Sequence, residues 1–454
     1  MRIGTLISIL SQSGIALLFF LSSPPSLGQT AAEPVTLESI LKSTLSSNGQ
    51  IQEATQDIEI AREQLELAKS ALFPKASALL LAAPIFEEKG TPLASTANWS
   101  KWGPYLKGSI ELAQPIYSFG QIGNYRKAAE SQIVAKTGLA DVKRAEVVYT
   151  AKELYYGYLM ARELESLVED LVKYLEEAID TAEKPIKQKK KSLVKPHDLY
   201  RLKTALEDLN QKKLYAKQAK TTAEKAVAWI SNQSFESLGE GRLRPENFKK
   251  KKLEEYLVEA KAKRPELKAL ASGQEARAAL RDAKRAQSYP ILFVGGFASF
   301  AWSPVREKQP SVFAYDPFNR TEGGIGLGLK FDLEFKKHAA EAGEQEAERM
   351  KLKATESYAA PGIELQVKKA FWELEQAEAS LEIAERRKKL AKKWFISNGM
   401  GWSIGLTPAK DLLESLEGDG LARKNYIETI YSLNTALAKL TQAVGEEVTE
   451  LKYR

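Results

Sequence analysis

Two similar stretches of sequence decide the fold of this chain. The first is "AREQLELAKSALFP", Ala61–Pro74, and the second is "ARAALRDAKRAQSYP", Ala276–Pro290. Both read A-R-x-x-L-x-x-A-K-x-A and then reach an aromatic residue and a proline. Residues that favour helices fill each phrase, and proline cannot continue a helix. We therefore expect each phrase to form the end of a helix, and the two helices to be copies of one another.

The similarity extends well beyond these phrases, at an offset near 215 residues. Further matching pairs are "LESILKSTLSSNGQI" from Leu37 with "LEEYLVEAKAKRPEL" from Leu253, "AKELYY" at Ala151 with "VKKAFW" at Val367, and "HDL" at His197 with "KDL" at Lys410. We therefore predict a first repeat over 33–235, a polar linker over 236–247, a second repeat over 248–450 and a tail over 451–454. Solenoid repeats are shorter and usually more numerous, so two long copies indicate a pseudo-symmetric assembly.

After each proline the hydrophobic pattern changes to the twofold alternation of a strand. The segments are "KASALLLAA" from Lys75, "LKGSIELA" at Leu106–Ala113, "ILFVGGFASFAW" from Ile291 and "IGLGLKFDL" at Ile325–Leu333. They predict β-hairpins at about 75–116 and about 291–333, with long loops near 84–104 and 303–322. Aromatic residues rim both hairpins: Trp99, Trp102 and Tyr105 in the first, and Trp302, Phe313, Tyr315 and Phe318 in the second.

The alternation predicts which side chains share a face of the last strand. Ile325, Leu327, Leu329 and Phe331 fall on one face, opposite Lys330 and Asp332. One reading is a soluble hairpin packed on helices, and the other is part of a membrane β-barrel with the first four side chains toward lipid. Four strands cannot close a barrel and open edges cannot lie in lipid, so a barrel requires several chains.

Composition and the N-terminal segment favour an exported protein. Residues 1–32 carry Arg2, the apolar run "GIALLFFL" and then prolines and small residues, which predicts a signal peptide too short to span a membrane. The 454 residues include no cysteine and only two histidines, which excludes disulfides, thiolate sites and a His-rich metal site. The net charge of +7 is dispersed and does not favour nucleic-acid binding.

The remainder of each repeat is predicted to be a long helical hairpin. One helix runs from "SFGQIGNYRKAAES" to about Glu183, a length of roughly 100 Å, and its counterpart runs from about Glu334 to Ser397 with a kink expected at Pro361. Returning helices are expected over 198–230 and 411–444. A heptad seam on the second long helix predicts packing against a neighbour; it comprises Val367, Ala370, Leu374, Ala377, Leu381 and Ala384.

Over the predicted mature sequence the chain resembles the TolC-like outer-membrane efflux proteins. The resemblance rests on the twofold repeat, "AREQLELAKSALFP", "LAQPIYSFGQIGNYRKAA" and "GLTPAKDLLESLEGDGLARKNYIETIYSLNTALAKL". It implies a mixed, mostly α-helical fold in which three chains share a twelve-stranded outer-membrane β-barrel continuous with a periplasmic α-helical barrel.

The resemblance also implies a constriction at the periplasmic tips of the helical hairpins. At the second tip, Gly405 matches the turn glycine, and Asp411 and Glu414 match the acidic residues. At the first tip, Asp198 matches an acidic position, while Ser192 stands in place of the turn glycine. We expect Lys195 and Lys410 to be possible charge partners of these carboxylates, and N-capping is an alternative role for Asp411.

No pattern in the sequence indicates an enzyme, a cofactor or a metal site. "GGIGLGLK" lacks the ending of a phosphate loop, His197-Asp198 has no accompanying nucleophile motif, and "KQKKK" at Lys187–Lys191 reads as a solvated tip. Two functions remain. The first is a passive outer-membrane exit duct that works with a periplasmic adaptor and an inner-membrane pump. The second is a structural or adaptor-like periplasmic coiled-coil protein outside the membrane. The alternating strands favour the duct, whose cargo the sequence does not indicate.

Overall fold

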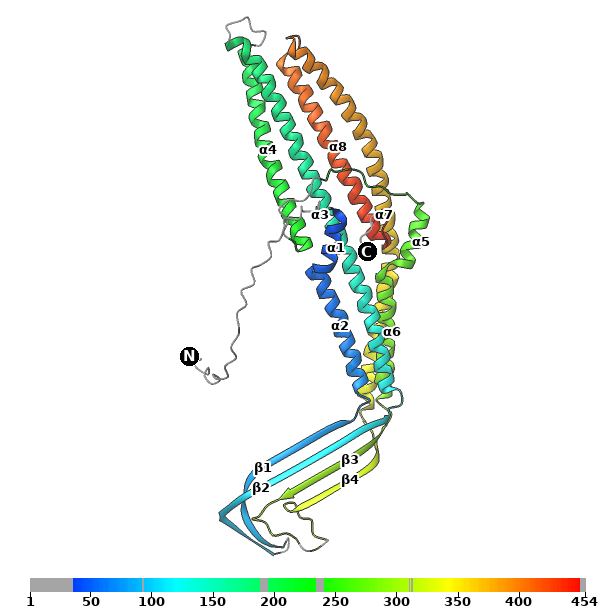
Figure 1. The fold of residues 1–454 in the computed structure, drawn as a ribbon. Coiled ribbons are helices and arrows are strands. Elements are labelled where there is room, and N and C mark those ends of the chain that lie inside the picture. Colours follow the sequence, from blue (N-terminus) through cyan, green and yellow to red (C-terminus); the bar gives the residue numbers. More distant parts are fainter. Residues whose placement is uncertain are drawn as a thin grey trace, which may run out of the picture.

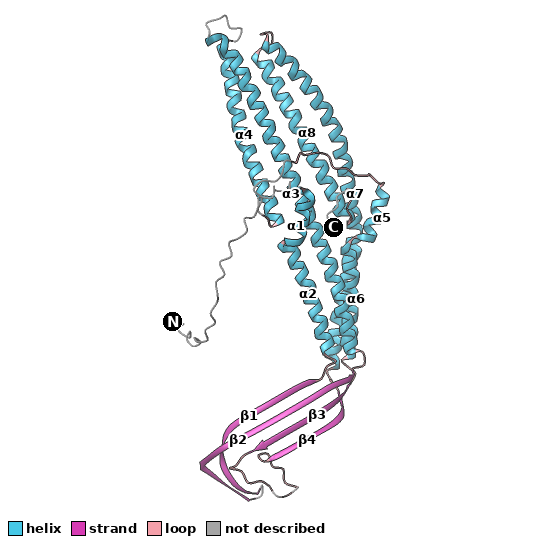
Figure 2. Ribbon diagram, in the orientation of Figure 1, coloured by secondary structure: helices cyan, strands magenta, loops and turns pink. Residues whose placement is uncertain are grey.

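The computed structural model describes residues 36–91, 94–187, 195–233, 241–309, 311 and 313–449. The molecule is long, with a body of helices and a four-stranded sheet that extends from one end (Figure 1). Helix and strand are fully segregated along its length (Figure 2). The expected signal peptide, the tail and Ser192 lie outside the described residues, as does residue range 236–240 of the expected linker.

The two repeats have the same order of elements: two shorter helices, two strands and two long helices. The first comprises α1 (Leu37–Ser47), α2 (Gly49–Ser70), β1 (Lys75–Thr91), β2 (Ala94–Tyr117), α3 (Gln121–Lys187) and α4 (Pro196–Ser231). The second comprises α5 (Leu253–Lys263), α6 (Pro265–Ala286), β3 (Ile291–Trp302), β4 (Arg320–Lys330), α7 (Phe335–Ser403) and α8 (Ala409–Val444). The similar segments Ala61–Pro74 and Ala276–Pro290 contain the ends of α2 and α6, which lead into the strands.

The first hairpin is longer than the sequence analysis expects. The expected loop over 84–104 is wrong, because β1 and β2 remain paired through it. Phe86 pairs with Trp102 and Glu87 with Asn98, so that β2 bulges between these pairs. The prolines suggested a loop, but β1 is an edge strand and β3 pairs with β2 only from Leu106 onward. A missing N–H is tolerated there.

The sheet has the order β1-β2-β3-β4 with antiparallel neighbours throughout. Residues paired directly across antiparallel strands project from the same face. In the part of the sheet where β2 pairs with β3, one face therefore carries only uncharged side chains and glycines, almost all of them apolar. It comprises Ala76, Ala78, Leu80, Ala82, Leu106, Gly108, Ile110, Leu112, Gln114, Leu292, Val294, Gly296, Ala298, Phe300, Trp302, Thr321, Gly323, Ile325, Leu327 and Leu329. We call these residues the apolar sheet face.

The opposite sheet face is mixed. Lys107, Ser109 and Glu111 of β2 project from it, and Ser299 of β3 donates a hydrogen bond to Glu322 of β4 at 3.2 Å. Phe293 and Phe297 cover glycines of β4 on this side. In this part of the sheet, the charged side chains of β1, β2 and β4 therefore all lie on the opposite face.

Packing along the helical body follows the expected seam. Val367, Ala370, Leu374, Ala377 and Ala384 are buried, and Leu381 is partly buried. Several of these side chains share one core with Leu433, Leu437 and Leu440 of α8, which confirms that the seam packs against the returning helix. α7 continues as one helix through Pro361. Among the described helices, none has the length and hydropathy to cross a membrane.

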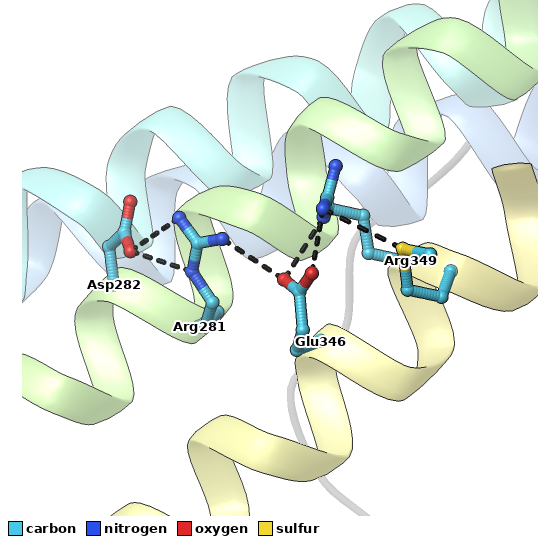
Figure 3. A network of polar contacts seen from close by, with 5 residues as sticks. Arg281, Asp282, Glu346 and Arg349 are labelled. Carbon is cyan, nitrogen blue, oxygen red and sulfur yellow. Dashed lines mark hydrogen bonds and ion pairs between the residues drawn. The ribbon is translucent and has the colours of Figure 1, made fainter.

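A network of charges joins α6 to α7 near the sheet (Figure 3). Arg281 of α6 contacts Asp282 at 2.8 Å and Glu346 of α7 at 3.0 Å, and Arg349 donates to both oxygens of Glu346. Hydrogen bonds from Arg349 and Arg281 lower the pKa of Glu346 to about 2. This carboxylate therefore stays ionised over the whole range of pH that most proteins meet.

Candidate functional site

The second tip turn joins α7 to α8 through Gly405. This residue has φ of +78°, a left-handed conformation that glycine adopts without steric cost. Its N–H donates to the carbonyl of Trp402 at 3.0 Å, and the N–H of Leu406 donates to the carbonyl of Gly401 at 2.8 Å. The turn is thus closed by backbone hydrogen bonds that require Gly405 at this position.

The carboxylates expected at this tip lie at the start of α8. Pro408 occupies the N-cap, so Asp411 lies in the first turn and does not cap the helix. Asp411 and Glu414 are both exposed, and Lys410 Nζ lies 3.6 Å from a carboxylate oxygen of Glu414. Asp411, in the first turn, interacts favourably with the helix dipole, an effect that falls off within that turn.

The first tip has the same arrangement at the start of α4. Lys195 occupies the N-cap and Asp198 lies in the first turn, where His197 Nε2 and Arg201 Nη1 lie 3.6 and 3.8 Å from its carboxylate. Lys195 accepts a backbone hydrogen bond from Asp198 through its carbonyl. Ser192 lies outside the described residues, so its expected place in the turn stays a prediction.

Both tips lie at the end of the molecule that is farthest from the sheet (Figure 1). One hydrophobic core ties them together and includes Leu175 of α3, Leu202 of α4, Trp402 of α7 and Leu412 of α8. The core places Asp198, Asp411 and Glu414 at a single end. Asp198 and Asp411, which correspond to each other in the two repeats, therefore also lie at the same end of the molecule.

Sequence reasoning missed the apolar character of the second tip. Met400, Ile404 and Leu406 are exposed around Gly405. Exposed apolar side chains gathered at one point favour contact with another protein. The sequence contained a signal for this apolar tip, since Met400, Ile404 and Leu406 all lie within five positions of the turn glycine Gly405.

At the other end, β4 carries three of the four residues expected to share an apolar face. Ile325, Leu327 and Leu329 lie on the apolar sheet face, and Lys330 lies on the opposite face. Leu327 is 75% exposed, so little else in the chain covers it. β4 ends at Lys330, and Phe331 therefore lies just beyond the strand, where the chain turns toward α7.

A second feature that sequence reasoning missed joins the outer ends of the two hairpins. Arg306 lies over the rings of Phe86 and Phe318, at 4.8 and 4.3 Å from their centroids, and forms an ion pair with Glu88. The carboxylate of Asp316 accepts backbone hydrogen bonds within the same loop. The loop after β3 thus packs on the first hairpin, a long-range contact without a local sequence signal.

The profile of the family described as "Outer membrane efflux protein" matches residues 256–446. The second repeat of the chain is therefore similar to this family. The matched segment contains β3, β4 and the tip turn with Gly405, Asp411 and Glu414. No curated protein matches the chain by sequence.

Solved outer-membrane channels share the fold over nearly the whole chain. The Campylobacter jejuni CmeC outer membrane channel aligns with a TM-score of 0.74 at 14% identity, covering 97% of this chain and 95% of CmeC. VceC, an outer membrane protein from Vibrio cholerae, aligns with a TM-score of 0.70 at 13% identity, covering 91% and 96%. The Neisseria gonorrhoeae MtrE outer membrane channel, in its open state, gives 0.69 at 17%, covering 91% and 89%. The shared fold includes both the strands and the long helical hairpins of the present chain.

Proposed function

We propose that this protein is the outer-membrane exit channel of a tripartite efflux or type I secretion system. It conducts substrates passively from the periplasm to the exterior. The observation that carries the proposal is the apolar sheet face, which spans all four strands without a charge. A lipid-facing barrel surface needs such a face, whereas a periplasmic coiled-coil or adaptor protein has no use for it. The match of residues 256–446 to the outer membrane efflux protein family supports the same location.

The proposed assembly is a homotrimer. In one chain β1 and β4 are the edges of the sheet, and their unpaired backbone groups cannot lie in lipid. Pairing β4 of each chain with β1 of the next closes the barrel, and three chains give twelve strands, above the minimum of about eight. The helical hairpins then line up below the barrel as the wall of a periplasmic tube.

The tip is the proposed periplasmic entrance. Threefold symmetry turns Asp411, Glu414 and Asp198 into rings of carboxylates, and such rings attract cations and repel anions. Ion pairs of Lys195 and Lys410 with these carboxylates are expected to hold the tips closed only weakly. Exposed ion pairs such as Lys410–Glu414 contribute only about 0–1 kcal/mol each. The exposed Met400, Ile404 and Leu406 suit a protein partner at this end, in keeping with a periplasmic adaptor that links the channel to an inner-membrane pump.

Two measurements on the detergent-solubilised protein test this proposal. Native mass spectrometry is expected to give three chains per particle. Insertion into planar lipid bilayers is expected to give discrete conductance steps. A monomer that inserts stably, or a trimer that never conducts even after the carboxylates of the tip are removed, contradicts the proposal.

A further inference from the structure

A cluster of three side chains that can bind a metal lies where the sheet joins the helical body. Asp332 and Glu334 lie between β4 and α7, and His338 lies in the first turn of α7. One ligand atom from each side chain lies within 4.8 Å of the other two. All three come from one short segment of one chain, so the cluster does not depend on assembly or on the proposed function.

The backbone brings these side chains together. Glu334 and His338 are four residues apart, which places them on the same side of the first helical turn, and the N–H of His338 donates to the carbonyl of Glu334 at 3.0 Å. Asp332 accepts a hydrogen bond from the N–H of Glu334 at 3.3 Å through Oδ1. Its other oxygen, Oδ2, faces the histidine.

His338 is positioned like a metal ligand whose second ring nitrogen has a hydrogen-bond partner. The residue is only 2% exposed, its Nε2 lies 3.3 Å from Asp332 Oδ2, and its Nδ1 lies 3.4 Å from the hydroxyl of Ser288. When Nδ1 carries the ring proton and donates it to Ser288, Nε2 presents a lone pair to a carboxylate oxygen. A metal-binding histidine commonly has this second hydrogen bond, which fixes the ring and its tautomer.

The separation of the two atoms matches a particular class of ion. Histidine nitrogen and carboxylate oxygen bind Zn²⁺ at about 2.0–2.2 Å, so two such ligands in a tetrahedral site lie about 3.3 Å apart. The observed distance of 3.3 Å between Nε2 and Oδ2 has this value. One nitrogen and two oxygens suit Zn²⁺ better than Mg²⁺ or Ca²⁺, which prefer oxygen ligands alone.

The cluster is not a requirement of the junction itself. At the offset of 215 residues that separates Ala61 from Ala276, the equivalent positions in the first repeat are Tyr117, Phe119 and Gly123. None of these side chains offers a histidine or carboxylate ligand, although a strand there also leads into a long helix.

We infer that Asp332, Glu334 and His338 form a Zn²⁺-class site that joins the end of β4 to the start of α7. A bound ion would link the strand end to the helix start and hold the junction of sheet and helical body rigid. Lys337 competes with the ion, because its Nζ lies 2.5 Å from an oxygen of Glu334.

Titration calorimetry with Zn²⁺ tests the inference on full-length protein in detergent after dialysis against a chelator. We expect one Zn²⁺ per chain, at least tenfold weaker binding in Asp332→Asn and Glu334→Gln, and none in His338→Gln. Ser288→Ala is expected to weaken binding about tenfold through the lost support of the ring. Lys337→Ala is expected to strengthen it.

Two controls match these variants. His197→Gln removes the only other histidine, and Glu344→Gln removes an exposed carboxylate of the same helix; both should bind Zn²⁺ as the wild type does. Should His338→Gln fail to fold, the exposed Asp332→Asn still decides the question. Absence of Zn²⁺ binding by the wild type, or equal binding by Asp332→Asn, overturns the inference. So does equal loss of binding in His197→Gln.

Discussion

Leu327 in β4 pairs directly with Val294 in β3, so both side chains project from the same face of the sheet. Val294 in turn pairs with Gln114 near the end of β2, and the next pair on this face joins Leu112 to Gly296. The register therefore carries one apolar face across four strands that come from opposite halves of the chain. This relationship ties the two repeats to a single lipid-facing surface in the proposed channel.

Replacing Leu327 by arginine is expected to impair insertion of the barrel. A cation on the lipid face near the middle of the bilayer costs roughly 2–4 kcal/mol per chain, and a trimer carries three copies. The measurement is the amount of heat-modifiable trimer in outer-membrane fractions, compared by gel electrophoresis with the wild type.

Ser109→Arg is the matched control for Leu327→Arg, because Ser109 lies on the opposite sheet face and pairs with Ser299. It is expected to assemble nearly as well as the wild type, as is Lys330→Ala. If Ser109→Arg were the more damaging of the two arginine variants, the faces would be exchanged, as they are after a register slip of one residue.

Removing the tip carboxylates is expected to change the current through the channel. In Asp411→Ala with Glu414→Ala, the rings of negative charge are lost, so the preference for cations over anions should fall severalfold and conductance should change. Single-channel recording under a salt gradient reports both quantities.

Glu428→Ala serves as the control for the tip variant, since Glu428 is a half-buried carboxylate of α8 far from the tip turn. It should leave the selectivity unchanged. Wild-type conductance and wild-type selectivity in the double variant would mean that Asp411 and Glu414 do not line the constriction.

The network around Glu346 is expected to make stability depend on pH in the acid range. The pKa of Glu346 is about 2 in the folded chain and 4.5 is its ordinary value. The network therefore stabilises the fold fully above pH 4.5, and its contribution is lost as the pH falls from 4.5 toward 2. Thermal unfolding should give a lower midpoint for Glu346→Gln than for the wild type at pH 7.

The difference between wild type and Glu346→Gln should shrink below pH 4.5 and vanish near pH 2. Glu344→Gln, on the same helix, is expected to show no such convergence. A midpoint difference that stays constant from pH 7 to pH 2.5 would show that ionisation of Glu346 is not the cause.

Asp419 in α8 is expected to behave in the opposite way. It is 4% exposed, its Oδ1 has no hydrogen-bond partner within the described part of the chain, and burial raises its pKa above 3.8. Its ionisation therefore costs stability as the pH rises through the folded-state pKa. Asp419→Asn should stabilise the fold at pH 7 by about 1 kcal/mol and have little effect near pH 3.

The control for Asp419→Asn is Asp57→Asn, which removes an exposed carboxylate that pairs with Lys136 at 2.8 Å. That variant should be neutral or slightly destabilising at pH 7. If Asp419→Asn were destabilising at pH 7 and at pH 3 alike, the carboxylate would have a structural role that its burial does not reveal.

The sequence predicted the parts of this fold that rest on local periodicity. The helical seam from Val367 to Ala384 and the alternation from Ile325 to Leu329 both follow from side-chain spacing, and both appear in the structure. The extent of the first hairpin did not follow, because Pro84 and Pro104 suggest a loop unless the edge position of β1 is known.

Long-range contacts were beyond the reach of sequence reasoning. Arg306 contacts Glu88 and Phe86 across more than two hundred residues, with no local pattern to announce the pairing. The cluster of Asp332, Glu334 and His338 is written within seven residues of sequence. The sequence alone did not show that these side chains meet, because this depends on where α7 begins. Its start at Phe335 places Glu334 and His338 on one side.

Fractionation of cells that produce the mature protein tests the central claim most directly. The account predicts that osmotic shock leaves the protein in the envelope and that it sediments with the outer membrane, from which only detergent extracts it. Release of the mature protein into the osmotic-shock fluid, without detergent, would contradict an outer-membrane channel and favour the periplasmic coiled-coil alternative.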